Sequence, residues 1–180
     1  IRGYMNQAIY KEIIPTLTLP EEELMSFAAS VTDRFQNPFI DHALLSISLN
    51  STAKWKARVL PSLEGYLEKT GQVPPCLSAS LAFYLAFYKG IGFVDATFTG
   101  DRNVKNQYPI SDDPKVLEFY DAHKDDSAAD YVHAVLSETS FWGKDLTTLA
   151  GLEETVVKDF TFIQEKGCYE LMKQIVNAAE

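Results

Sequence analysis

The stretch LSASLAFYLAFYKGIGFV, residues 77–94, is the longest apolar run of the sequence, and the fold has to be built around it. Two serines, Lys89 and two glycines interrupt the run. A membrane span needs about 20 predominantly apolar residues, so this run is too polar and too broken to be one. It predicts instead a buried core helix over residues 75–89, ended by Gly90.

The residues on either side of this run repeat apolar side chains at helical spacing. In LPEEELMSFAASVTDRFQNP, residues 19–38, Pro20 suits a first helical position, and three glutamates follow where the helix dipole favours acids. An apolar stripe that includes Phe27 follows, and the helix should end near Asn37, just before Pro38. The same signals predict further helices over residues 2–14, 39–47, 51–70, 114–123, 127–137, 151–166 and 168–178.

Strand signals are nearly absent from the sequence. Three glycines, two prolines and clustered Asn and Asp between Gly90 and Pro114 predict a surface loop over 91–112, with room for one short hairpin near 91–110. Pro61 is expected to kink or split the helix over 51–70. The sequence therefore predicts an all-α fold.

Length and composition set further limits on the class of protein. The 180 residues suffice for one domain with a substantial core, and 46% apolar with 23% charged residues is ordinary for a soluble globular protein. A net charge of -9 argues against general nucleic-acid binding, which requires a basic face. Cys76 and Cys168 lack metal-type spacing and fit a reducing, cytoplasmic setting, although a single disulfide is also compatible with the sequence.

The residues alone offer no catalytic motif. There is no Gly-rich phosphate loop after a strand and no H-E-x-x-H pair. The three histidines are scattered along the chain and are expected at the surface or at the core boundary; His42 is the best candidate among them, because it precedes a cationic stretch. We therefore predict no catalytic, cofactor-binding or metal-binding residue within this chain.

That cationic stretch is SISLNSTAKWKARVLP, residues 46–61. Lys54 and Arg58 are four residues apart and share a helix face. Lys54 falls in the first helical turn, where amides without intrahelical partners and an ammonium group together make an anion site. The alternative, which the pattern alone favours, is a solvated charged face. Lys56 is expected on the opposite, exposed side.

Two other features have structural interpretations. Trp142 and Gly143, in SETSFWGKDL, indicate a tight connection between helices. Tyr84 and Tyr88 are expected in the core, with hydroxyl groups that reach a partner.

Several segments of the sequence resemble the C-terminal domain of the mannitol dehydrogenase family, the polyol-specific long-chain dehydrogenases. They include IIPTLTLP, RFQNPFIDH, SISLNS and KARVLPSL, followed by LAFYKG, DDPKVLEFY and SFWGKDLTTLAGL. NPFIDHALLSISLNS is the specific part, and the helices after Pro114 are generic. The resemblance implies a multi-helical domain of the 6-phosphogluconate dehydrogenase C-terminal-like type. Within the family, these segments are most similar to the branch that interconverts D-altronate and D-tagaturonate with NAD in hexuronate catabolism.

The resemblance also implies how the chain is organised. In this family an N-terminal Rossmann domain binds the nicotinamide cofactor, and a K-x-x-x-x-N-x-x-H helix supplies the general acid/base lysine. This sequence has neither pattern. We therefore expect residues 1–180 to be a single substrate-side helical domain whose partners are a sugar-acid substrate and its own N-terminal Rossmann domain, with no nucleic acid and no membrane. Such a fragment should be inactive alone, with NAD bound mainly by the missing domain.

By this resemblance, the main candidate site residue is Lys54. It matches a basic residue that contacts the substrate in mannitol dehydrogenases. Asn50 and Ser51 would bind hydroxyl groups or shape the turn, while His42 and Arg58 are weaker candidates. Mannitol dehydrogenases have an arginine where this sequence has Ser46, a departure expected if the substrate differs. Two alternatives remain: a mannitol or fructuronate dehydrogenase of the same family, and a non-catalytic helical binding module.

Overall fold

The computed structural model describes residues 2–34, 51–90, 92–94, 97–99 and 113–179. Helices make up most of these residues, as the sequence predicted. The α-helices are α1 (Arg2–Ile13), α2 (Glu21–Asp33), α4 (Ser51–Lys54), α5 (Leu60–Thr70), α6 (Pro75–Lys89), α7 (Pro114–Ala122), α8 (Ala128–Ser137), α9 (Thr139–Trp142), α10 (Leu152–Lys166) and α11 (Cys168–Ala179). Shorter turns are η1 (Ile14–Thr16), η3 (Trp55–Val59) and η4 (Leu146–Thr148).

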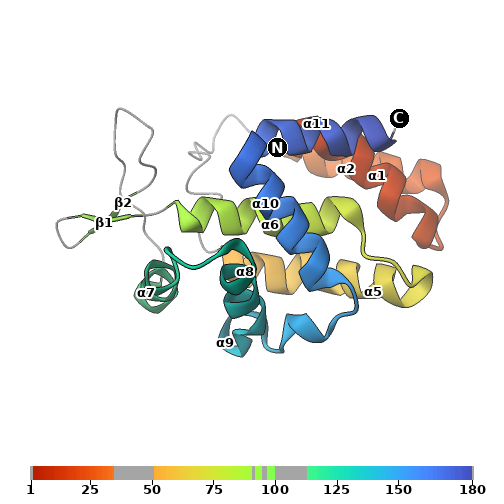
Figure 1. The fold of residues 1–180 in the computed structure, drawn as a ribbon. Helices are drawn as coiled ribbons and strands as arrows, with labels where there is room; N and C mark the ends of the chain where they lie inside the picture. The colour runs from red at the N-terminus through yellow and green to blue at the C-terminus, as the bar shows by residue number, and fades with distance from the viewer. Residues whose placement is uncertain (1, 35–50, 91, 95–96, 100–112, 180) are drawn as a thin grey trace.

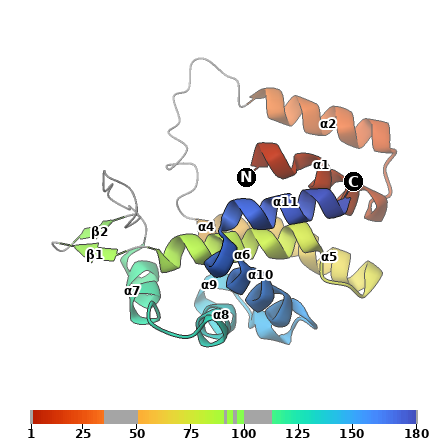
Figure 2. The ribbon, with the colours of Figure 1, turned by 45° about the horizontal axis from the view of Figure 1, so that its top comes forward.

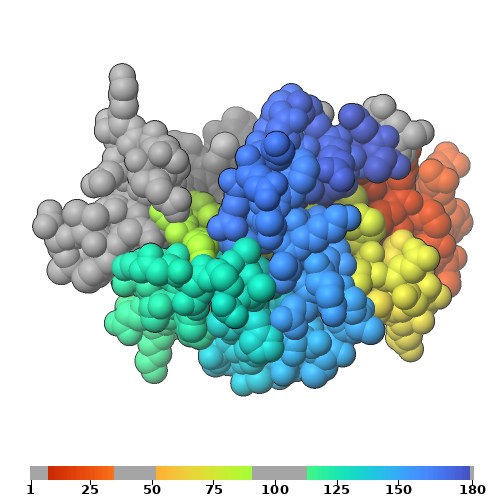
Figure 3. All heavy atoms as spheres, viewed as in Figure 1, coloured from red at the N-terminus to blue at the C-terminus, as the bar shows by residue number. Residues whose placement is uncertain are grey.

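Helix α6 is the central element, as its apolar sequence predicted. Pro75 occupies the first turn and Gly90 follows its last residue, which are the predicted ends. Helix α10 crosses it and makes the most extensive packing of the fold (Figure 1). In the space-filling view the later helices leave little of α6 visible (Figure 3). Nine of its side chains are buried, because an apolar helix can shed water only when neighbours cover it on several sides.

One hydrophobic core joins helices from both ends of the described chain. It extends from Ala8 on α1 to Leu171 on α11, and its largest fully buried side chains include Trp142, Tyr88 and Tyr120. Helices α1 and α11 pack on each other and on α6 (Figure 2). No helix within the described ranges is both long and apolar enough to cross a membrane.

Helix α2 departs from the prediction in three ways. Pro20 is the residue before the helix rather than its first residue, and the α-helix ends at Asp33, earlier than the predicted end near Asn37. The apolar stripe does not enter the core, because Phe27 is 69% exposed and no α2 side chain is buried. Helix α2 lies at the edge of the molecule, beyond α1 (Figure 2). The predicted helix over 39–47 lies outside the described residues.

The predicted hairpin is present at the end of α6. Strands β1 (Gly92–Val94) and β2 (Thr97–Thr99) pair antiparallel, with Phe93 opposite Phe98. They lie beside α7 in both ribbon views (Figures 1 and 2). Apart from this hairpin, the described elements are helical, so the all-α fold class is confirmed.

The helix over 51–70 changes its winding ahead of Pro61. In η3, the Leu60 amide donates to the Trp55 carbonyl, which is a π-type turn. A proline has no amide hydrogen, and in an α-helix its ring collides with the carbonyl four residues earlier, here that of Ala57. The wider turn relieves this collision, so the predicted disturbance at Pro61 is a local π-turn within a helix that continues to Thr70. Gly71 ends the helix in the left-handed conformation, with φ of 69°.

Candidate functional site

The candidate site lies at the start of the helix over 51–70. Lys54 ends α4 and is half-buried, whereas Arg58, one turn later, is exposed. Ser51 is the first residue of α4. Of the five residues predicted to bind substrate, Lys54 and Arg58 are thus brought onto one helix, while Asn50 and His42 lie outside the described residues.

Lys56 points away from this pair, toward the connection after α9. It is exposed, as predicted, and its Nζ would lie 2.8 Å from a Cβ atom added to Gly143. Gly143 has φ of 78°, a left-handed conformation that glycine adopts without strain. The left-handed conformation of Gly143 agrees with the predicted tight connection after α9. The Lys56 side chain packs against the backbone of Gly143.

Two buried side chains attach the start of this helix to α6, one on each side of Lys54 in the sequence. Thr52 is 9% exposed, and its hydroxyl group forms a hydrogen bond with the Tyr84 hydroxyl. Trp55 donates from Nε1 to Ser80 Oγ at 3.2 Å. Ser80 in turn donates to the Leu77 carbonyl at 2.6 Å. Lys54 therefore projects from a backbone segment that is fixed on both sides.

The Tyr84 hydroxyl is also the centre of a longer buried chain of hydroxyl groups. Tyr120 of α7 donates to it at 3.2 Å. Burial, together with the neighbouring Tyr84, raises the pKa of Tyr120 well above its ordinary value, so Tyr120 keeps its proton and remains a donor. Because Tyr84 accepts from Tyr120, its own proton is available to Thr52 Oγ1. The sequence predicted that Tyr84 would find a partner, but not that the partner would be Thr52.

Aromatic rings enclose this hydroxyl chain. Trp142 packs edge-on against Trp55, with ring centroids 5.4 Å apart, and against Tyr84 at 6.1 Å. Trp142 is 1% exposed and donates from Nε1 to the Val135 carbonyl at 2.6 Å. The predicted structural role of Trp142 is confirmed, since its buried ring packs against Trp55.

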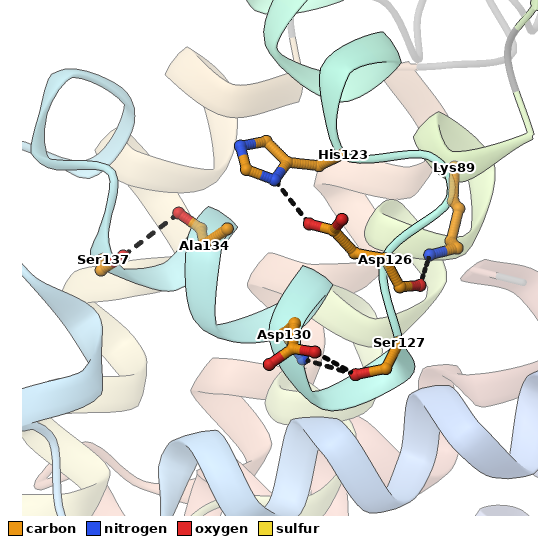
Figure 4. Close-up of polar contacts among 7 residues, drawn as sticks. All are labelled: Lys89, His123, Asp126, Ser127, Asp130, Ala134 and Ser137. Carbon is orange, nitrogen blue, oxygen red and sulfur yellow. Dashed lines mark hydrogen bonds and ion pairs between the residues drawn. The ribbon is translucent and has the colours of Figure 1, made fainter.

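A second polar cluster lies at the C-terminal end of α6, around Lys89 (Figure 4). Lys89 donates to the Asp126 carbonyl at 2.7 Å, and its Nζ lies 4.3 Å from the centroid of the Tyr131 ring. Burial lowers the pKa of Lys89, although the negative charges of Asp126 and Asp125 act to raise it. His123 Nδ1 lies 2.7 Å from Asp126 Oδ2. These contacts join α6 to the turn between α7 and α8, which is a structural role.

The remaining titratable candidates are also structural. His133 is exposed and pairs with Glu153 at 2.9 Å, so both described histidines lie at the surface or boundary, as predicted. Cys76 and Cys168 are free, and burial raises the pKa of each thiol, which leaves both in the unreactive form. Within the described part of the chain, no group of three or more His, Cys, Asp or Glu side chains could hold a metal ion.

Comparison of the sequence with known proteins places this helical domain in a family. The Mannitol dehydrogenase C-terminal domain family matches residues 1–164, and the chain belongs to this family. It is 41% identical over 179 residues to a protein of Enterobacter sp. (strain 638) named Altronate oxidoreductase, covering 96% of this chain and 35% of that protein. The Klebsiella pneumoniae (strain 342) protein of the same name is 40% identical over 181 residues, covering 97% of this chain and 35% of the relative.

A third relative of the same name, from Yersinia enterocolitica serotype O:8, is 39% identical over an alignment of 173 residues that covers 93% of this chain and 34% of that protein. The chain thus spans about a third of the length of the curated relatives it matches. The family predicted from the sequence is confirmed.

Proposed function

We propose that this chain forms the substrate-side domain of an NAD-dependent altronate oxidoreductase, also called tagaturonate reductase. Its reaction is D-altronate + NAD+ = D-tagaturonate + NADH, in hexuronate catabolism. The observation that carries the proposal is the identity of about 40% with proteins of that name over 93–97% of this chain. The two free cysteines are consistent with a reducing, cytoplasmic location.

Lys54 is the proposed substrate-binding residue of this domain. Both substrate and product are sugar acids, and an ammonium group near a helix start suits a carboxylate, because the positive end of the helix dipole adds to its charge. Half-burial strengthens this attraction, since a partly desolvated pair is less screened than one in bulk water. Arg58 is exposed and therefore contributes less; Asn50, Ser51 and His42 remain predicted hydroxyl-binding or turn-forming residues.

The nicotinamide cofactor does not fit the described residues. A dinucleotide site of the Rossmann type needs parallel strands with a glycine-rich turn into a helix, whereas β1 and β2 form a short antiparallel hairpin. We therefore assign binding of NAD and the general acid/base lysine to a preceding domain, and no step of hydride transfer to this chain. Its own contribution is to bind and orient the sugar acid.

The proposal is tested with the purified product of the gene that contains this chain. NADH formation is measured with D-altronate and with D-mannitol, and NADH consumption is measured with D-tagaturonate and with fructuronate. Preferred turnover of altronate and tagaturonate is the expected result. Preference for mannitol or fructuronate would assign another activity of the family, and no NAD(H)-dependent turnover of any of the four would indicate a binding module.

A further inference from the structure

We infer that the buried hydroxyl chain Thr52–Tyr84–Tyr120 is a positioning element that fixes Lys54 for substrate binding. The inference rests on the proposed function, and it assigns to these residues a role beyond stabilising the core. None of the three hydroxyl groups would touch the substrate, because Thr52 is 9%, Tyr84 8% and Tyr120 1% exposed.

The position of the chain in the fold supports this role. Thr52 lies two residues before Lys54, so its hydroxyl bond to Tyr84 fixes the backbone turn that carries the lysine. Tyr84 lies on α6 and Tyr120 on α7, so the bond ties a short helical segment to two longer helices. On the other side, the bond from Trp55 to Ser80 ends at the same helix α6.

The local winding makes such an anchor necessary. The π-type turn η3 begins at Trp55, immediately after Lys54, and π-turns are less favourable than α-helix. A helix start followed by a weakened turn has little rigidity of its own. The Thr52 and Trp55 bonds supply this rigidity from tertiary contacts, so that Lys54 meets a carboxylate without first losing conformational freedom.

A matched control bonds to the same helix α6 from another element, α8 (Ala128–Ser137). Tyr131 is fully buried, and its hydroxyl donates to the Leu85 carbonyl at 2.9 Å. Removing this hydroxyl deletes a buried bond to α6 that is not attached to the Lys54 segment. Tyr84→Phe and Tyr131→Phe should therefore cost similar stability, while only Tyr84→Phe loosens Lys54.

The experiment compares Thr52→Val, Thr52→Ser, Tyr84→Phe and Tyr131→Phe in the purified gene product, with Lys54→Ala as reference. We expect Thr52→Val and Tyr84→Phe each to raise KM for D-altronate roughly three- to tenfold, which is the change in affinity that loss of one buried hydrogen bond causes. KM for NAD should not change. Thr52→Ser keeps the hydroxyl group and should restore KM to within about twofold of the original, as should Tyr131→Phe.

The Thr52→Val/Tyr84→Phe double variant adds a second test. Because both substitutions break the same bond, their effects on KM should not multiply. The inference is wrong if Thr52→Val and Tyr84→Phe leave KM unchanged while Lys54→Ala raises it, if Thr52→Ser behaves as Thr52→Val, or if Tyr131→Phe has the same effect as Tyr84→Phe. If Tyr84→Phe does not fold, the Thr52 pair decides the result. Failure of the proposed function looks different: the original protein then shows no altronate turnover.

Discussion

Replacing Asp159 by asparagine is expected to stabilise the protein at neutral pH and to leave it unchanged in acid. Asp159 lies on α10 and is half-buried. Burial raises its pKa from the ordinary 3.8 to about 6, and the neighbouring Lys158 only partly opposes this. Within the described residues it makes no hydrogen bond or ion pair that would favour the charged form.

The sign and size of the effect follow from this pKa. The folded state holds the Asp159 proton more tightly than the unfolded state, so this group favours folding at low pH, and the advantage is lost as pH rises through about 4 to 6. Raising the pKa from 3.8 to about 6 is roughly a hundredfold change in proton affinity, or about 3 kcal/mol. Because Asp159 is partly exposed, we discount this cost to about 1–2 kcal/mol.

The assay is urea unfolding of the original protein and of Asp159→Asn, between about pH 4 and about pH 7.5. The difference in free energy of unfolding should grow with pH, in favour of the variant. Glu165→Gln, at an exposed position of the same helix, is the control and should change stability by less than about 0.5 kcal/mol. A difference that stays constant with pH, or a variant less stable at neutral pH, would refute the argument.

Two other predictions concern the core helix and the isolated chain. Glu12 accepts hydrogen bonds from the Cys76 amide at 2.7 Å and the Leu77 amide at 3.4 Å, so Glu12→Ala should destabilise the fold by about 1–2 kcal/mol in thermal or urea unfolding. Glu12→Gln keeps an acceptor and should cost less; equal costs would contradict the capping role. The 180-residue chain alone is expected to show no NADH turnover with D-tagaturonate, and turnover above a blank would show that this chain itself holds a catalytic site and a cofactor site.

Helix ends were predictable where proline and glycine mark them. The bounds of α6, and the end of α5 at Gly71, follow from local backbone chemistry that a sequence displays directly. The exposure of Phe27 was not predictable, because periodicity shows which side chains share a face but not what covers that face. The short helix α9 was also missed, since its four residues are too few to show a period.

The candidate site was predictable only in part. Lys54 was found from its charge and its place near a helix start, and its half-burial agrees with that reasoning without testing its role. Thr52 was not singled out, because a threonine in a first turn is common and its bond to Tyr84 joins residues far apart in the sequence. Only the tertiary fold, which brings α4 and α7 to Tyr84 of α6, places these hydroxyl groups together.

The central claim, that Lys54 binds the sugar acid, is tested most directly by kcat/KM for D-altronate in Lys54→Ala and Lys56→Ala. Lys54→Ala removes a charge-assisted hydrogen bond of about 1.5–3 kcal/mol, so kcat/KM should fall roughly tenfold to a hundredfold, with little change in KM for NAD. Lys56 lies over Gly143 on the opposite side, so its variant should stay within about twofold. Equal, small effects of the two substitutions would show that the cationic stretch is a solvated helix face and that the claim is wrong.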